Sequence, residues 1–312
     1  MSNSKIILPG GAGLVGQNLV ARLKAKGYRN IVVLDKHRAN LAVLQQVQPD
    51  IVVEYADLAE PGDWQRHFED AEVVVMLQAQ IGGNNQQEFV RNNVDSTRLI
   101  LDAIKVNKVP RLVHISSSVV ESMADDFYTN TKKDQEQMVL NSGISCPILR
   151  PTLMFGWFDR KHLGWLSRFM NKVPVFPIPG HGRYMRQPLY AGDFCNIIIS
   201  CIENRNIEGI YNVSGHEKVN YIDIIREIKR ATGAGVLILK IPYALFYSLI
   251  WVWGLFDKNP PFTTQQLVAL QTKDEFEVID WPGVFDVQCT PFADAIDETF
   301  NDPTYTKVIL EF

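Results

Sequence analysis

The sequence predicts an α/β protein with a doubly wound parallel sheet, followed by a smaller C-terminal α/β unit. Three observations predict this fold: short continuous apolar runs, helical patterns that alternate with them, and a glycine-rich turn after the first run. Continuous apolar runs are typical of strands buried on both faces, and their alternation with helices indicates a parallel sheet. Right-handed crossovers then place the ligand crevice at the carboxyl ends of the strands.

The apolar runs and helical spacings repeat through the first half of the chain and stop after Pro151. Beyond it, Gly, Pro and aromatic residues become denser, which indicates a unit built from long connections. Two further helices are expected there, over 193–203 and 222–232. The strands predicted before Pro151 are 5–8, 31–34, 51–55, 73–77, 111–115 and 146–149, and the helices are 14–26, 87–107 and 128–141.

Composition narrows the class of protein. With 312 residues, 46% hydrophobic and 21% charged, the chain can bury a full core and a second unit. A formal charge of −4 argues against nucleic acid as a partner, since phosphate-binding domains normally carry a basic surplus. The chain enters a strand almost at once, which leaves no room for a secretory signal. Four scattered cysteines lack metal-ligand or redox spacing and indicate reduced thiols in a cytoplasmic protein without a metal: Cys146, Cys195, Cys201 and Cys289.

A glycine-rich turn lies where the first predicted strand gives way to a helix. It satisfies both G-x-x-G-x-x-G and G-x-G-x-x-G. A tight turn without a ligand is the alternative, but the strand before it and the helix after it are the context that a pyrophosphate site requires. Glycines allow the backbone N–H groups and the helix N-terminus to approach the anion closely. The expected cofactor-binding residues here are Gly10, Gly11, Ala12, Gly13, Leu14, Val15 and Gly16.

A carboxylate ends the second predicted strand, nineteen residues beyond Gly16. Asp35 can accept hydrogen bonds from the hydroxyls of an adenosine ribose. Because a carboxylate there repels a 2′-phosphate, NAD is expected rather than NADP. His37 and Arg38 follow closely and keep NADP open as the lesser alternative.

Tyr128 and Lys132 lie one turn apart on the same face of a predicted helix. A free tyrosine has a pKa near 10, but an ammonium group and a positive nicotinamide ring both favour the phenolate. Tyr128 can then take a proton from a substrate hydroxyl as hydride leaves the carbon. A chance Tyr-x-x-x-Lys is common, so the order of the motifs along the chain carries the argument.

Three serines, at 116–118, follow the strand 111–115 at the carboxyl edge of the sheet. A hydroxyl at this position can hydrogen-bond and orient the reacting oxygen. Serines at strand ends are also common turn formers, which is the alternative interpretation.

These motifs together resemble the extended short-chain dehydrogenase/reductase family, in particular its nucleotide-sugar epimerases, dehydratases and 4-keto reductases. The resemblance covers nearly the whole chain and implies a Rossmann domain over 1–155, to which the chain returns around 188–213. Residues 156–312 are then mostly the substrate-binding domain. It also implies a homodimer formed through the helices 87–107 and 128–141.

The family's pattern assigns roles to particular residues. Ser118 matches its catalytic serine or threonine, Tyr128 its catalytic base, Lys132 its nicotinamide-ribose lysine, and Asn93 its structural asparagine behind the active site. Arg186 matches the arginine that holds the substrate diphosphate, although a solvated loop arginine is the alternative. Further cofactor contacts are expected at Lys36, Asp57, Leu58, Gln78, Ala79 and Pro151, and further substrate contacts at Ser117 and Tyr190.

Two departures from the family leave the substrate open. The loop between Ser118 and Tyr128 has nine residues, which is much shorter than is typical of the family. The uncharged run 241–256 contains Trp251 and Trp253 and predicts either a buried helix or lid, or a contact with a membrane surface. A nucleotide sugar is therefore the leading substrate, and an apolar alcohol is the alternative. A cofactor-binding subunit without catalysis is the third possibility, although it would not need the Ser/Tyr/Lys set.

Overall fold

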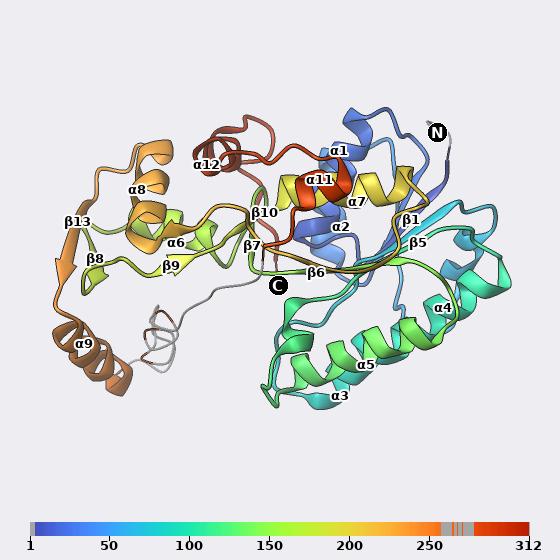
Figure 1. The fold of residues 1–312 in the computed structure, drawn as a ribbon, viewed down its shortest axis with the longest axis horizontal. Helices are drawn as coiled ribbons and strands as arrows, with labels where there is room; N and C mark the ends of the chain where they lie inside the picture. The colour runs from blue at the N-terminus through green and yellow to red at the C-terminus, as the bar shows by residue number, and fades with distance from the viewer. Residues whose placement is uncertain (1–3, 257–263, 265–266, 268–269, 271–277, 312) are drawn as a thin grey trace.

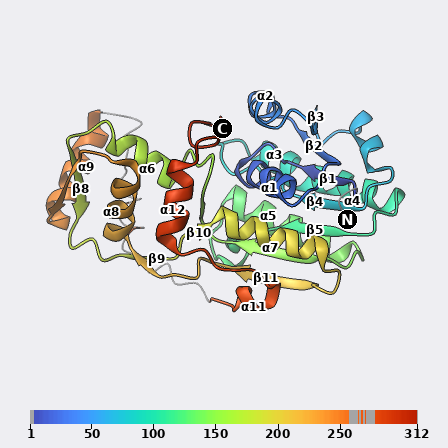
Figure 2. The same ribbon diagram turned by 90° about the horizontal axis from the view of Figure 1, so that it is seen from above.

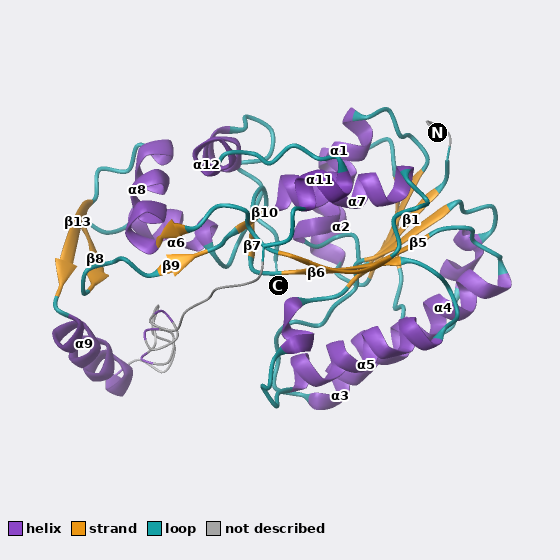
Figure 3. Ribbon diagram, viewed as in Figure 1, coloured by secondary structure: helices purple, strands orange, loops and turns teal. Residues whose placement is uncertain are grey.

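The computed structural model describes residues 4–256, 264, 267, 270 and 278–311 (Figure 1). A large parallel sheet with helices on both faces occupies one end of the molecule, and a smaller α/β unit occupies the other (Figures 1 and 3). The expected doubly wound Rossmann fold is therefore confirmed.

The large sheet has seven strands in the order β11-β6-β5-β4-β1-β2-β3, and every neighbouring pair is parallel. The order reverses between β1 and β4, so this is the point where a doubly wound sheet opens a crevice. The strands are β1 (Ile6–Pro9), β2 (Ile31–Asp35), β3 (Val52–Tyr55), β4 (Val73–Met76), β5 (Leu112–Ile115), β6 (Pro147–Pro151) and β11 (Gly209–Val213).

Helices cover both faces of this sheet. Figure 1 shows α1 (Leu14–Ala25), α2 (Arg38–Val47) and α7 (Ala191–Glu203) above it, and α4 (Ser96–Val106) and α5 (Phe127–Asn141) below it. Each layer buries an apolar cluster against the sheet. Residues 191–213 thus return to the large sheet through α7 and β11, although the division of the chain at residue 155 stays a proposal.

The predicted helix 87–107 is not one regular helix. It begins with α3 (Gln86–Phe89), continues as a π-helical turn over Val90–Asp95, and only then becomes α4. Such π turns are rare and frequently lie at functional sites. Asn93 lies inside this turn. Helix α2 was not among the expected elements.

The smaller unit is built from short strand pairs and helices. Helices α6, α8 and α12 enclose its apolar core together with β8. The paired strands are β8 (Val175–Pro179) with β13 (Leu237–Ile241), β9 (Met185–Arg186) with β12 (Val219–Asn220), and β7 (Met154–Phe155) with β10 (Leu189–Tyr190). The remaining helices are α6 (Leu163–Met170), α8 (Tyr221–Thr232), α9 (Tyr243–Phe256), α11 (Trp281–Phe285) and α12 (Phe292–Asn301).

The uncharged run 241–256 forms helix α9, but this helix is not buried. Phe246 and Ile250 pack inward, whereas most other side chains of the helix are exposed. The expectation of a buried helix is therefore wrong for this segment. Among the residues that the structure describes, we find no helix with the length and apolar character needed to span a membrane.

Candidate active site

The glycine turn packs tightly on two sides and is open on the third. Gly10 has a φ of +76°, and a Cβ there would lie 2.3 Å from the Cα of Gln78. A Cβ at Gly16 would lie 2.2 Å from the carbonyl oxygen of Gly11. At Gly13, by contrast, the nearest atom to a Cβ would be the carbonyl oxygen of Gly10, at 3.9 Å. The open side at Gly13 therefore leaves room for a pyrophosphate to approach the backbone, as a dinucleotide requires.

The carboxylate of Asp35 is fixed against this turn. Its Oδ2 accepts a hydrogen bond from the backbone N–H of Ala12 at 3.0 Å, and its Oδ1 accepts one from the N–H of His37 at 3.0 Å. Beside it, the guanidinium of Arg38 lies over the ring of Tyr55, 3.7 Å from the ring centroid. Asp35 is half-buried at the carboxyl end of β2, where the sequence predicts a ribose contact.

The polar groups around the expected adenine side pair with one another. Lys36 Nζ donates to Asn92 Oδ1 at 2.7 Å. Arg91 Nη1 donates to Asp57 Oδ2 at 2.7 Å. Burial raises the pKa of Asp57, but the bonds from Arg91 and from the Ala59 N–H outweigh it, so the net pKa is lowered. Of the other expected cofactor contacts, Leu58 and Pro151 are buried and Ala79 is exposed.

Tyr128 lies in the first turn of α5. Asp126 caps this helix by accepting from the backbone N–H of Thr129 at 2.9 Å, which fixes the start of the helix. Ser117 and Asp126 are the two side chains that act on the pKa of Tyr128. Burial raises the pKa of Tyr128, the hydroxyl of Ser117 lowers it, and the charge of Asp126 raises it, with a net rise above 10.

The structure therefore brings Ser117 to the tyrosine, where the sequence pattern placed Ser118. Ser117 is buried and caps the 3-10 turn Ser118–Glu121, accepting from the N–H of Val119 at 3.4 Å. Ser118 is the first residue inside that turn.

Lys132 is 1% exposed and points into the protein. Its Nζ donates to the carbonyl oxygen of Ile115 at 3.1 Å and to Oε1 of Gln135. Burial lowers the pKa of Lys132 to about 7, and the charge of Glu136 opposes this shift. That the ammonium of Lys132 lowers the pKa of Tyr128 stays a prediction.

A buried chain of amides and hydroxyls connects Lys132 to the glycine turn. Gln135 accepts from Lys132 and donates through Nε2 to Thr97 Oγ1 at 2.8 Å. Gln78 donates to the same hydroxyl at 3.1 Å, and its backbone lies against Gly10. These contacts thus fix the carboxyl ends of β1, β4 and β5 relative to one another.

Asn93 is fully buried and joins α5 to the segment after β4. Its Nδ2 donates to Thr131 Oγ1 at 2.9 Å, and its Oδ1 accepts from the N–H of Gln80 at 2.6 Å. The side chain thus supports the residues on either side of the crevice, which is the kind of role that the resemblance implies for it.

A buried ion pair was not expected from the sequence. Glu136 accepts from Ser116 Oγ at 2.5 Å and from Arg150 Nε at 3.0 Å. Arg150 also pairs with Glu121 at 2.8 Å. The sequence holds one indication that Glu136 lies near the site: it is four residues after Lys132 and thus on the same face of α5.

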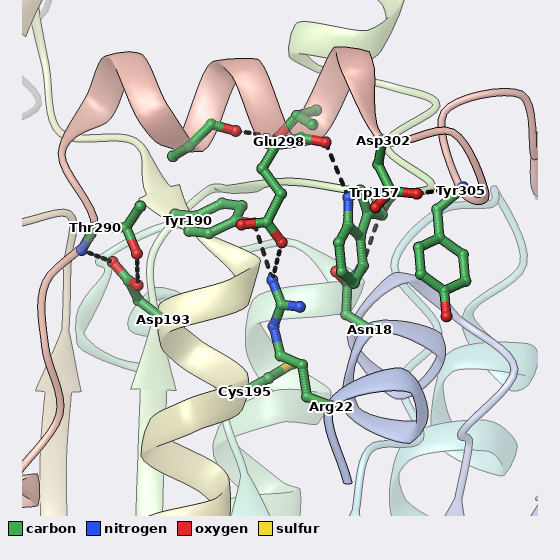
Figure 4. A network of polar contacts seen from close by, with 12 residues as sticks. Asn18, Arg22, Trp157, Tyr190, Asp193, Cys195, Thr290, Glu298, Asp302 and Tyr305 are labelled. Carbon is green, nitrogen blue, oxygen red and sulfur yellow. Dashed lines mark hydrogen bonds and ion pairs between the residues drawn. The ribbon is translucent and has the colours of Figure 1, made fainter. Parts of the chain in front are cut away.

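Arg186 and Tyr190 do not lie open to a ligand. Arg186 Nη1 donates to the carbonyl oxygen of Met185 at 2.7 Å, and its Nη2 donates to that of Leu270 at 2.6 Å. The hydroxyl of Tyr190 accepts from Arg22 at 2.9 Å in a network between α1 and α12, where Arg22 also pairs with Glu298 at 2.9 Å (Figure 4). Burial raises the pKa of Tyr190.

Comparison with known proteins decides the family. The model described as the NAD dependent epimerase/dehydratase family matches residues 6–214. The chain belongs to this family. Both the expected family and the expectation of NAD as its cofactor are confirmed by this match.

Several relatives of this epimerase/dehydratase family member are named for reactions on nucleotide sugars. A trifunctional UDP-glucose 4,6-dehydratase/UDP-4-keto-6-deoxy-D-glucose 3,5-epimerase/UDP-4-keto-L-rhamnose-reductase of Arabidopsis thaliana is 26% identical over 269 residues. The match covers 73% of this chain but 40% of that protein, so the chain spans about two fifths of the relative's length.

Solved structures extend the likeness to the fold. The UDP-glucuronic acid 4-epimerase of Bacillus cereus, in complex with NAD, has a TM-score of 0.64 and 25% identity, covering 76% of this chain and 88% of that one. The Bordetella bronchiseptica enzyme WbmG, in complex with NAD and UDP, has a TM-score of 0.73, 17% identity and coverage of 98% and 96%. The match to WbmG also covers the smaller unit, and at this identity it shows a shared fold alone.

Proposed function

We propose that this protein epimerises or reduces a nucleotide-activated sugar at a ring carbon, with Tyr128 as the proton donor and acceptor. The observation that carries the proposal is the placement of α5 at the carboxyl end of β5, where buried Lys132, one turn after Tyr128, donates to the carbonyl oxygen of Ile115 at 3.1 Å. The hydroxyl of Ser117, just beyond the same strand, lowers the pKa of Tyr128. The names of the relatives support the substrate class.

The cofactor site fits NAD. The open side of the turn at Gly13 receives the pyrophosphate, and Asp35 faces the adenosine ribose. When bound, NAD would supply a hydride acceptor at this site and, in its reduced form, a hydride donor. We assign the adenosine end of the site to the sequence-predicted residues Lys36, Asp57 and Leu58, and the nicotinamide end to Gln78, Ala79, Tyr128, Lys132 and Pro151.

In this reaction the protein's own residues transfer one proton and orient one substrate oxygen. In oxidation, Tyr128 takes the proton of the sugar hydroxyl while a hydride leaves the carbon that bears it. In reduction, Tyr128 returns a proton to the carbonyl oxygen as hydride arrives. An epimerase performs both steps and delivers hydride to the opposite face, so it causes no net oxidation; a 4-keto reductase performs only the second.

The raised pKa of Tyr128 keeps the phenol protonated at neutral pH in the ligand-free protein. It is therefore ready to donate in the reductive direction. For the oxidative direction, the positive nicotinamide ring must favour the phenolate. Of the two serines predicted from the sequence, we assign the orienting role to Ser117, because its hydroxyl is the one that lowers the pKa of Tyr128.

Arg186 is the proposed contact of the substrate diphosphate. Arg186 can hold the substrate diphosphate if its guanidinium exchanges backbone carbonyls for phosphate oxygens. If Arg186→Ala leaves the substrate affinity unchanged, that role is excluded.

A homodimer through α4 and α5 is supported by exposed apolar side chains such as Leu140, and a monomeric mass by light scattering would exclude it.

The test of the proposed function is a panel of UDP- and dTDP-sugars incubated with the protein and NAD or NADH, with the products analysed by NMR. We expect a change of configuration at one ring carbon, or reduction of a 4-keto sugar, that depends on Tyr128. If no panel member is converted while an apolar alcohol is oxidised, the alternative substrate class replaces the nucleotide sugar. Binding of NAD without conversion of either class would favour a non-catalytic role.

A further inference from the structure

Helix α9 exposes apolar side chains at the end of the molecule farthest from the large sheet (Figures 1 and 2). Trp251 is 55% exposed, Trp253 51% and Phe256 86%. The other exposed large apolar side chains of the helix are Leu245, Tyr247, Leu249, Val252 and Leu255. Burying such side chains is favourable, so a surface of this kind calls for a partner.

The exposed apolar side chains extend around most of the helix. At about 100° per residue, they span an arc of about 240°, from Tyr247 through Leu249 to Trp253. Phe246 and Ile250 occupy the remaining side, which packs inward. A helix that docks in a protein groove, or against a second copy, needs an apolar stripe of about 100°. An apolar arc more than twice as wide is better matched by an apolar phase, such as lipid acyl chains, that contacts the helix from several sides.

The charges around α9 match an anionic surface. Gly180 donates to the carbonyl oxygen of Ile241, so the turn after β8 lies beside the start of the helix. Arg183 follows this turn and Lys240 lies near the end of the strand before α9, and both side chains are exposed. The segments 175–184 and 237–256 contain no carboxylate, and the next one along the chain is Asp257.

Length and composition indicate how deep the helix can lie. Its 14 residues are about 21 Å long, against a hydrocarbon core of about 30 Å. Trp251 and Trp253 are of the type that prefers the boundary between headgroups and acyl chains. The helix can therefore enter one leaflet but not cross the bilayer.

We propose that α9 inserts into one leaflet of an anionic membrane and holds the smaller unit of the protein on the lipid surface. Arg183 and Lys240 contact the headgroups, and the apolar arc of α9 contacts the acyl chains. This surface is independent of the reaction at Tyr128, so either proposal can fail without the other.

The test is flotation of the whole protein with vesicles of phosphatidylcholine mixed with phosphatidylglycerol, and with vesicles of phosphatidylcholine alone. The variant Leu249→Glu/Trp253→Glu places two carboxylates on the apolar arc. The matched control, Val52→Glu/Ile309→Glu, places two carboxylates at exposed apolar positions on the large sheet and near the C-terminus. Thermal melting checks that both variants remain folded.

We expect wild type and the control variant to float with the anionic vesicles, less with the neutral ones, and the α9 variant to lose at least tenfold in bound fraction. Brominated lipids should quench wild-type tryptophan fluorescence, a readout that requires no variant. If wild type stays unbound and unquenched, or if the α9 variant floats equally well, the proposal is wrong. An oligomer that the α9 variant converts to a monomer, without vesicle binding by wild type, would instead identify a second copy as the partner.

Discussion

The hydroxyl of Ser117 lowers the pKa of Tyr128, and Ser117 is the residue immediately before the serine that the sequence pattern selects. Ser117 is buried and ends the extended segment after β5, whereas Ser118 begins a 3-10 turn. The side chain that faces the tyrosine is thus decided by where the turn starts, which spacing in the sequence does not reveal.

Ser117→Ala and Ser118→Ala form a matched pair of variants. Ser117→Ala should lower kcat about tenfold or more, since a hydrogen bond to the reacting group is worth about 1 to 3 kcal/mol. Ser118→Ala should keep kcat within about twofold of wild type, because position 118 lies inside the 3-10 turn rather than at the tyrosine. Steady-state kinetics on the converted sugar checks this, and the reverse order of effects would return the role to Ser118.

Tyr128→Phe removes the proton donor and keeps the ring. Its kcat should fall about a hundredfold to ten-thousandfold, the usual contribution of general acid–base catalysis. NADH affinity, measured by fluorescence titration, should stay close to that of wild type. A variant that keeps wild-type turnover would remove Tyr128 from the mechanism.

Substitutions of two glycines in the phosphate turn should separate effects on NAD binding from effects on folding. Gly16→Ala places a Cβ 2.2 Å from the carbonyl oxygen of Gly11 and should lower the melting temperature. Gly13→Ala meets no atom within 3.9 Å, so the protein should remain as stable as wild type but bind NAD more weakly, because the methyl group projects where the pyrophosphate approaches. Melting curves and calorimetric titration of both variants check this. Unchanged NAD affinity of a folded Gly13→Ala protein would contradict the assignment.

The buried ammonium of Lys132 predicts a stability that depends on pH. Its pKa is about 7 in the folded protein, against 10.5 for an unperturbed lysine. Between these limits the unfolded chain binds a proton that the folded protein lacks, so the free energy of unfolding rises with pH. From pH 7 to about pH 9, wild type should gain about 1 to 3 kcal/mol relative to Lys132→Met, which lacks the titrating group.

Urea unfolding of wild type and Lys132→Met at the two pH values measures this difference. The comparison cancels the titration of groups that both proteins share. If the difference is constant or falls as pH rises, Lys132 is not a buried group with a lowered pKa.

The network around Arg22 should stabilise the contact between the two parts of the chain. Arg22 donates to Tyr190 and pairs with Glu298, and its guanidinium lies 4.2 Å from the ring centroid of Trp157 (Figure 4). Arg22→Met should reduce the free energy of unfolding by about 1 to 3 kcal/mol, because buried partners lose their donor. The control Arg226→Met removes an exposed pair with Asp223 and should cost less than about 0.5 kcal/mol. Equal effects of the two changes would contradict a structural role for the network.

The sequence predicted the parts of the protein that depend on local pattern. The alternation of buried strands and helices and the glycine turn at Gly10–Gly16 follow from apolar period and backbone geometry, and both are present in the fold. The π-helical turn around Asn93 was missed, because its apolar spacing is close to that of a regular helix. The exposure of α9 is one of two alternatives that the sequence leaves open, because an apolar run does not reveal whether protein or another phase covers it.

The most direct test of the account is a titration of NADH into protein freed of any bound nucleotide, followed by fluorescence or calorimetry. The account predicts saturable binding of one NADH per chain, tighter than the binding of NADPH, and weaker in folded Gly13→Ala. Absence of binding by a folded protein would contradict the assignment of the crevice at Gly10–Gly16, and with it the proposed reaction at Tyr128.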